Sequence, residues 1–261
     1  MSVDVPVKLA DMAATSDDTL LGGRVKLRQP RDGYRVAIDP VLLAASVPAG
    51  EADRVLDIGC GTGAAGLCLA ARVPGCRVVG LERDPDVARL AAENIVRNDF
   101  ADRLSVVEGD LLHPPALLAV GSFTQVMANP PFLEATRASA SPVAARATAA
   151  VESEAMLADW IDFALAMLRD KGTLTLIHRA DRLGDLLAAL SGRAGGIIVF
   201  PLWPGEGKPA KRILLQAKKG NAAPMTLAQG LILHRLHRAD GRNSEAAEAI
   251  LRHGAALPLV P

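Results

Sequence analysis

Cysteine, net charge and long apolar runs are what this sequence has little of. The three cysteines among its 261 residues include no CxxC pair and have no histidine nearby, a pattern that fits neither a disulfide framework nor a zinc site. We therefore expect free thiols in a reducing compartment and no bound metal. The 29 basic residues equal the 29 acidic ones, so the overall charge does not indicate a nucleic-acid partner. Any surface for such a partner has to come from a local excess of charge.

The apolar residues are spread along the chain rather than gathered in one segment. No run reaches the roughly 18 uncharged apolar residues of a membrane-spanning helix. Residues 1–14 carry acids and no continuous apolar stretch. We expect a cytoplasmic protein that is neither secreted nor embedded in a membrane. Hydrophobic residues make up 50% of the chain and charged residues 22%, which predicts a globular protein with a sizeable core.

From Arg54 onward, short β-rich segments alternate with longer, Ala/Leu-rich amphipathic ones. This alternation is typical of repeated strand–helix units and predicts an α/β fold, with a mostly parallel sheet and helices on both faces. We expect seven strands, at Arg54–Gly59, Arg77–Leu81, Leu104–Glu108, Phe123–Ala128, Gly172–His178, Gly196–Leu202 and Arg212–Ala217. We expect helices at Ala64–Val73, Pro85–Asn98, Glu154–Arg169 and Asp181–Leu190.

The strand–helix units occupy residues 53–220, which we take as the main domain. Residues 1–52 are rich in turns and form an N-terminal extension, and residues 221–261 form a small C-terminal appendage packed on the core. Residues 133–151 are rich in Ala, Ser and Arg and directly follow a predicted strand. They are too long for an ordinary connection, so we expect a functional lid or a poorly ordered loop there. The extension and this loop are candidates for substrate contact.

A buried strand containing Asp57 runs into a turn whose glycines are Gly59, Gly61 and Gly63. Glycines let the backbone turn tightly and approach a ligand closely, and the helix that follows offers unpaired N–H groups, so we expect a nucleotide-like ligand. This spacing also satisfies the dinucleotide fingerprint, with Glu82 at the end of the next strand as the ribose-binding acid. Asp57 favours the other interpretation, in which a carboxylate faces the cationic amino-acid end of S-adenosylmethionine.

Asp110 follows the third predicted strand and supplies a further carboxylate. It can accept a hydrogen bond from an adenine amino group. Ligands of open α/β sheets lie outside the carboxyl ends of the strands, where Asp57, Glu82 and Asp110 are all expected. For Asp110 alone, a helix cap in an ordinary turn is the competing interpretation.

The fourth predicted strand ends in a turn that selects the chemistry, Asn129-Pro130-Pro131-Phe132. An exocyclic or amide nitrogen is a weak nucleophile because its lone pair is delocalised. The Asn129 side-chain oxygen and the Pro130 carbonyl can accept its two N–H groups and so direct the lone pair at a methyl group. The two prolines hold these oxygens in place, and Phe132 offers a face on which a flat base can stack. The turn therefore favours methyl transfer over hydride transfer.

Together these motifs resemble the class I S-adenosylmethionine-dependent methyltransferases with the N6-adenine type of active site. Two more segments, residues 32–44 and 208–216, resemble the bacterial tRNA(Val) adenine-N6 methyltransferases, which modify the adenine next to the anticodon. The similarity runs from about Thr15 to Leu251. It implies a seven-stranded Rossmann-like sheet, S-adenosyl-L-methionine as cofactor and tRNA as substrate. It also implies that residues 34–43 close over the cofactor, with Tyr34, Arg35 and Asp39 lining the pocket.

The sequence departs from this family in its C-terminal appendage. Asn243 and Ser244 stand where related sequences tend to have Tyr-Thr, so the substrate choice could differ. The same Asn-Pro-Pro-aromatic turn also serves enzymes that methylate guanine N2 in rRNA, adenine in DNA or a protein glutamine amide. Two functions of a different class compete with methyl transfer: an RNA-binding scaffold without activity and a nicotinamide dehydrogenase.

Two local excesses of positive charge support an RNA partner. One lies between residues 205 and 220 and the other near the N-terminus, and they consist of Lys208, Lys211, Arg212, Lys218 and Lys219, and of Arg24, Lys26, Arg28 and Arg31. Such clusters can contact phosphates even in a neutral chain. The five histidines are scattered, and we expect them at the surface or at sheet ends rather than as ligands: His113, His178, His234, His237 and His253. No residue stands out as an obligatory base.

Overall fold

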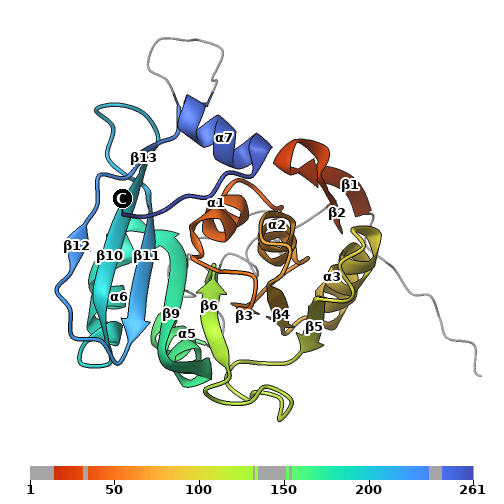
Figure 1. Ribbon diagram of the computed structural model, residues 1–261, viewed down its shortest axis with the longest axis horizontal. Coiled ribbons are helices and arrows are strands. Elements are labelled where there is room, and N and C mark those ends of the chain that lie inside the picture. The colour runs from red at the N-terminus through yellow and green to blue at the C-terminus, as the bar shows by residue number, and fades with distance from the viewer. Residues whose placement is uncertain are drawn as a thin grey trace, which may run out of the picture.

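A nine-stranded sheet forms the centre of the computed structural model, which describes residues 15–31, 35–131, 133–134, 151–152, 155–234 and 243–260. The strand order is β12-β10-β11-β9-β6-β3-β4-β5, and β13 pairs with β10 (Figure 1). The strands of this sheet are β3 (Arg54–Ile58), β4 (Arg77–Glu82), β5 (Leu104–Glu108), β6 (Phe123–Ala128), β9 (Leu168–Arg179), β10 (Ala194–Trp203), β11 (Arg212–Lys219), β12 (Thr226–Leu227) and β13 (Leu231–Ile232). All seven predicted strands are therefore confirmed, and two short strands extend the sheet beside β10.

Five strands run parallel to one another, in the spatial order β5, β4, β3, β6 and β9. Strand β11 is antiparallel to both of its neighbours, β9 and β10. The expected mostly parallel α/β sheet is thus confirmed. Two two-stranded pairs lie outside it: an antiparallel hairpin of β1 (Thr15–Leu20) and β2 (Val25–Pro30), and a parallel pair of β7 (Leu133–Glu134) and β8 (Val151–Glu152). Most of the expected lid, residues 135–150, lies outside the described residues.

Helix α3 (Pro85–Arg97) begins at a residue suited to capping. Asp84 caps this helix, since its Oδ1 accepts hydrogen bonds from the backbone N–H groups of Asp86 and Val87, at 2.9 and 3.1 Å. The helices are α1 (Asp39–Ser46), α2 (Ala64–Arg72), α3 (Pro85–Arg97), α5 (Leu157–Met167), α6 (Leu183–Leu190) and α7 (Glu245–His253), with 3-10 turns η1 (Leu21–Gly23) and η3 (Ala180–Arg182). No helix in the described part of the chain is both long and apolar enough to cross a membrane.

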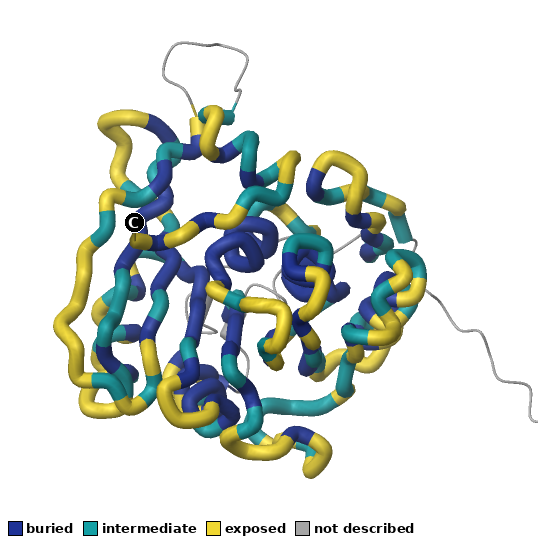
Figure 2. Tube along the Cα trace, viewed as in Figure 1, coloured by how far each residue is buried: buried dark blue, intermediate teal, exposed yellow. Residues whose placement is uncertain are grey.

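The sheet separates two apolar layers, because successive residues of a strand point to opposite faces. Val55 joins the layer with α1, α2 and Ile95 of α3, whereas Leu56 joins the layer with α5 and α6. The central strands are accordingly buried along their length (Figure 2). The four helices predicted from periodicity are present, and they cover both faces as expected.

Helix α1 is not predicted from the sequence because it lacks the pattern that reveals a surface helix. All eight of its residues are buried, so no polar face marks its period. It packs on α2, and the Arg72 guanidinium donates to the carbonyls of Ala44 and Val47 at the end of α1, at 2.9 and 2.6 Å. The N-terminal region thus contributes directly to the core.

Candidate active site

The carboxyl ends of the parallel strands meet at one edge of the sheet. Ile58, the last residue of β3, pairs with Leu81 on one side and with Ala128 on the other. The residues just beyond these pairs are Gly59, Glu82 and Asn129. The structure therefore brings the glycine loop (residues 59–63) beside both the second predicted acid and the Asn-Pro-Pro turn, as the motif spacing requires.

Two of the three glycines in the glycine loop, Gly59 and Gly61, serve different purposes. Gly59 has φ +63°, and a Cβ there would lie 2.5 Å from Cη2 of Trp160 on α5, so the indole ring occupies the space a side chain would need. Gly61 has φ +56°, and a Cβ there would meet nothing within 4 Å. Gly63, with φ +87°, precedes the first residue of α2. Gly59 is thus required by packing, whereas Gly61 borders open space in which a ligand can approach the backbone.

Glu82 links the glycine loop to the next strand connection. Its Oε2 accepts a hydrogen bond from the Gly61 N–H at 2.9 Å, and its Oε1 accepts one from the Asp84 N–H at 2.9 Å. The carboxylate therefore orients the loop while remaining partly exposed at the strand end. Asp110, also partly exposed, uses Oδ1 to accept from the Leu112 N–H at 3.0 Å, which closes a turn.

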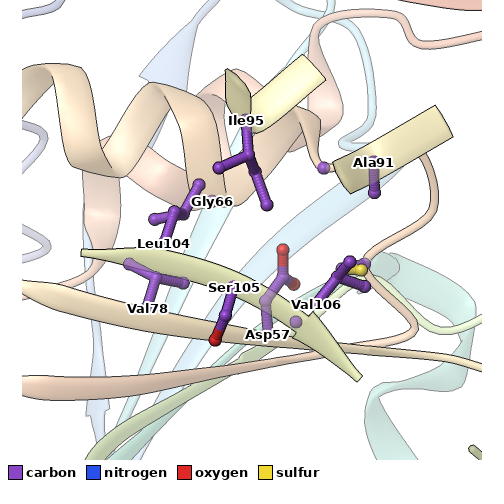
Figure 3. Close-up of a pocket in the computed structure, with 11 residues that line it drawn as sticks. Asp57, Gly66, Val78, Ala91, Ile95, Leu104, Ser105 and Val106 are labelled. Atoms are coloured by element: carbon purple, nitrogen blue, oxygen red, sulfur yellow. The ribbon is translucent and has the colours of Figure 1, made fainter. Parts of the chain in front are cut away.

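Asp57 lies beneath the glycine loop rather than on its open side. The side chain is 3% exposed and borders a cavity of about 10 Å³ between the sheet and helices α2 and α3, with Gly66, Ala91 and Ile95 opposite (Figure 3). Its Oδ2 has no hydrogen-bond partner among the described residues. Burial raises the pKa of Asp57 to about 7, the charge of Glu82 adds to this effect and a hydrogen bond from the Gly66 backbone opposes it. A direct contact between Asp57 and a cofactor stays a prediction.

The turn after β6 is held from the neighbouring strand. Asn129 is partly buried, Pro130 is buried and Pro131 is partly exposed, while Phe132 lies outside the described residues. His178, near the end of β9, is fully buried, and its imidazole lies against the Pro131 backbone. Proline has no backbone N–H, so the Pro131 carbonyl is the polar group that the imidazole meets there.

His178 is neutral at physiological pH. Burial lowers its pKa to about 4, the positive charges of Arg182 and Arg179 act in the same direction and the Pro131 contact opposes them. Sequence reasoning placed this histidine at the surface or a sheet end. The sheet end is correct, but the side chain is buried against the turn, and only the pairing of β9 with β6 reveals this.

The N-terminal residues expected to line the pocket make polar contacts within the fold. Arg35 pairs with Asp18 on the hairpin (Nη2 to Oδ2, 2.9 Å), and Asp39 pairs with Arg212 at the start of β11 (Oδ2 to Nε, 3.0 Å). Tyr34 lies outside the described residues. Their role beside a cofactor stays a prediction.

The expected basic cluster of residues 208–219 is divided by the fold, which corrects the sequence interpretation. Arg212 pairs with Arg179 at the carboxyl edge, whereas Lys218 pairs with Thr173 near the opposite edge. Because β11 crosses the sheet, six residues separate the two ends by roughly 20 Å. Lys208 and Lys211, both exposed, precede β11 and share the edge of Asn129.

The second expected basic run lies on the hairpin and is partly neutralised. Arg28 pairs with Asp17 through Nε and Oδ1 at 3.0 Å. Arg24 and Arg31 donate to backbone carbonyls of Leu21 and Thr15. This run therefore offers less free positive charge than the sequence indicates. Within the described residues, no three His, Cys, Asp or Glu side chains gather as a metal site.

The chain is similar to proteins of known family. Two curated relatives from Porphyromonas gingivalis strains are named tRNA1(Val) (adenine(37)-N6)-methyltransferase and are 37% identical over 169 and 158 residues, covering 62% and 58% of this chain. The chain spans 66% and 61% of their own lengths, a little under two thirds. A relative of the same name from Aeromonas hydrophila is 31% identical over 218 residues, covering 82% of this chain and 87% of that protein.

Among solved structures, a predicted O-methyltransferase from Agrobacterium tumefaciens superposes with a TM-score of 0.70 at 28% identity, covering 84% of this chain and 98% of that chain. The methyltransferase small domain family matches residues 37–184. This segment runs from α1 to the start of α6 and includes the glycine loop, Glu82, Asp110 and the Asn-Pro-Pro turn. The resemblance seen in the sequence is confirmed, and the chain belongs to the methyltransferase small domain family.

Proposed function

We propose that this protein transfers a methyl group from S-adenosyl-L-methionine to the exocyclic N6 of an adenine in tRNA. The observation that carries the proposal is the pairing of β3 with β6. It sets the glycine loop and Asn129 directly beside each other at the carboxyl edge, one residue beyond the Ile58–Ala128 pair. A donor held at the loop and an acceptor held at Asn129 are then neighbours, and such positioning supplies much of the rate of a displacement reaction.

The residues of the loop fit the cofactor. Gly61 leaves room for close approach, and Glu82 at the strand end can accept from ribose hydroxyls. Asp110 can accept from an adenine amino group, and Asp57 supports the loop from below. When bound, S-adenosyl-L-methionine supplies an electrophilic sulfonium methyl group. The protein's part is to bind it, orient it and exclude water.

Asn129 and Pro130 act on the acceptor nitrogen. Their side-chain and backbone oxygens accept its two N–H groups, which directs the lone pair toward the methyl group. The attacking amine is neutral, so its proton leaves as or after the methyl group arrives and no strong base is needed. The buried His178 side chain packs against Pro131 and so helps to keep the turn in place. Phe132 provides a stacking face for the base.

The substrate is inferred from the relatives, which are named for methylation of adenine 37 in tRNA1(Val). A target base in folded tRNA has to leave its stack to reach the turn. Residues 1–52 cover the cofactor, residues 53–220 carry the chemistry and residues 221–261 complete the core. A tRNA substrate implies that the reaction takes place in the cytoplasm. Guanine N2 in rRNA, adenine in DNA and a protein glutamine amide are the competing acceptors.

The decisive experiment identifies the methylated atom. Protein is incubated with methyl-labelled S-adenosyl-L-methionine and total tRNA from a strain that lacks this gene, and the nucleosides are separated by mass spectrometry. We expect label in N6-methyladenosine, and labelling that is slower by roughly 10²-fold or more with Asn129→Ala. Label in guanine, in a ribose oxygen or in added rRNA, DNA or release-factor protein in preference to tRNA would contradict the proposal.

A further inference from the structure

The β1–β2 hairpin is attached to α3 through its free edge. Among the described residues, strand β2 pairs with β1 and with no other strand, in the register Thr15–Pro30 to Leu20–Val25. Its other side faces α3 (Figure 1). A strand edge buried against a helix needs partners for its backbone groups, because unpaired N–H and C=O groups are costly.

Two asparagines on α3 and just after it supply those partners. The Arg28 N–H donates to Asn94 Oδ1 at 2.7 Å, and Asn94 Nδ2 donates back to the Arg28 carbonyl at 2.8 Å. Lys26 and Asn98 repeat the arrangement, at 2.8 and 2.7 Å. Residues four apart on a helix and two apart on a strand advance by similar distances, about 6 Å and 7 Å, so the side-chain amides take the place of a third strand.

The two asparagines differ in one hydrogen bond. Each side-chain amide has a second N–H group that needs an acceptor. Asn98 donates its second N–H to the Asn94 carbonyl on the same helix, at 2.7 Å. Asn94 donates its second N–H to the Thr62 carbonyl in the glycine loop, at 3.0 Å. Asn94 is fully buried, and these bonds use its oxygen and both of its N–H groups. One side chain therefore joins the hairpin to the loop.

We propose that Asn94 is a positioning residue through which docking of the N-terminal hairpin sets the conformation of the glycine loop and so the affinity for the cofactor. The inference rests on the proposed function for the identity of the loop's ligand. Thr62 lies between the open Gly61 and Gly63, which precedes α2. Glu82 holds the loop at the Gly61 N–H on one side, and Asn94 holds it at the next residue on the other.

Asn98 provides a matched control. Asn94→Ala and Asn98→Ala both remove two hydrogen bonds to β2, and only the first removes the bond to the loop. S-adenosylhomocysteine binding is measured by calorimetry on the full chain. We expect Asn94→Ala to weaken binding about tenfold and Asn98→Ala to leave it within about twofold. Equal weakening in both variants, or none in a folded Asn94→Ala, would overturn the role of Asn94.

A measurement on the unaltered protein decides the matter if Asn94→Ala fails to fold. Coupling between two sites is reciprocal, so ligand binding at the loop has to strengthen hairpin docking. Amide hydrogen exchange at Lys26 and Arg28 should slow when S-adenosylhomocysteine is added, while the Ala223 amide, in the exposed turn after β11, should not change. Unchanged exchange at both hairpin amides, in protein that binds the ligand, would refute the coupling alone. Absence of ligand binding would refute the proposed cofactor as well.

Discussion

The two halves of the carboxyl edge are built in different ways. The cofactor half, which consists of β3, β4, β5, α2 and α3, draws the glycine loop and its acids from consecutive strand–helix units, residues 54–110. The acceptor half, which consists of β6, β9 and β11, brings residues distant in sequence, including His178 and Arg212, to the same edge of the sheet as Asn129. A local motif thus marks the first half, whereas long-range pairing assembles the second.

The two halves also bury ionisable groups of opposite behaviour. Asp57 in the cofactor half has a raised pKa, so folding favours its protonated form. His178 in the acceptor half has a lowered pKa, so folding favours its deprotonated form. In both cases burial is the main cause, because it disfavours whichever form carries charge. At neutral pH His178 is therefore uncharged, whereas Asp57, with a pKa of about 7, is ionised in part of the molecules.

The largest effect that separates the halves should come from Asn129→Ala. The variant loses an acceptor for the attacking amine and not a contact to the donor, so we expect turnover to fall by roughly 10²-fold or more with cofactor affinity nearly unchanged. Single-turnover methylation and calorimetry measure the two quantities. Asn221→Ala, in a surface turn after β11, is the control and should change neither. An equal loss of both would mean that Asn129 belongs to the cofactor half.

The pH dependence of stability should distinguish Asp57 from His178. Because the folded pKa of Asp57 is raised to about 7 from 3.8, its favourable contribution is complete below pH 3.8 and is lost as pH rises to 7. Asp57→Asn should therefore gain stability relative to the unaltered protein across that window, by at most about 4 kcal/mol.

His178→Gln should show the opposite trend. The pKa of His178 is lowered to about 4 from 6.5, so its contribution is complete above pH 6.5 and is lost as pH falls to 4. The variant should gain relative stability toward acid, by at most about 3 kcal/mol. Urea unfolding at about pH 4.5, 6 and 8, two values inside both windows and one above them, measures both differences. Parallel profiles for the three proteins would show that folding shifts neither pKa.

Within the cofactor half, the two glycines should respond differently to alanine. A Cβ at Gly59 meets Trp160, so Gly59→Ala should lower the free energy of unfolding by roughly 2–3 kcal/mol. Gly61→Ala adds backbone strain of about 1 kcal/mol and no clash, and its main effect should be weaker cofactor binding. Trp160→Leu should recover part of the stability lost in Gly59→Ala and none lost in Gly61→Ala. Chemical denaturation tests this, and similar losses for both glycines would contradict it.

The smallest effect concerns RNA binding at the two edges of β11. Lys211→Ala removes a charge beside the acceptor half, and Lys218→Ala removes the same charge near the opposite edge. We expect the first to reduce the salt slope of tRNA binding by about 0.7–0.9 and the second to leave it unchanged. Filter binding at several salt concentrations measures both slopes. An equal change at both positions would mean that tRNA extends over both edges.

Periodicity and motif spacing were sufficient to predict the sheet, four helices and the meeting of the glycine loop with Asn129. They missed α1, whose residues are all buried, and the hairpin, because β1 has a single apolar residue, Leu20, although β2 alternates buried and more exposed positions. They also missed α7 and the short strands β12 and β13. They treated residues 208–219 as one basic cluster, although the strand expected at Arg212–Ala217 keeps its two ends at opposite edges of the sheet.

The sequence alone determined where the ligand-binding turns lie, because glycine and proline act on the backbone of their own residue and parallel strands end at a shared edge. Only the tertiary structure decided what holds those turns. The Asn94 bond to Arg28 joins residues 66 apart, and the His178 contact to Pro131 depends on the pairing of β9 with β6. Such contacts are made by packing between distant segments, which leaves no local pattern in the chain.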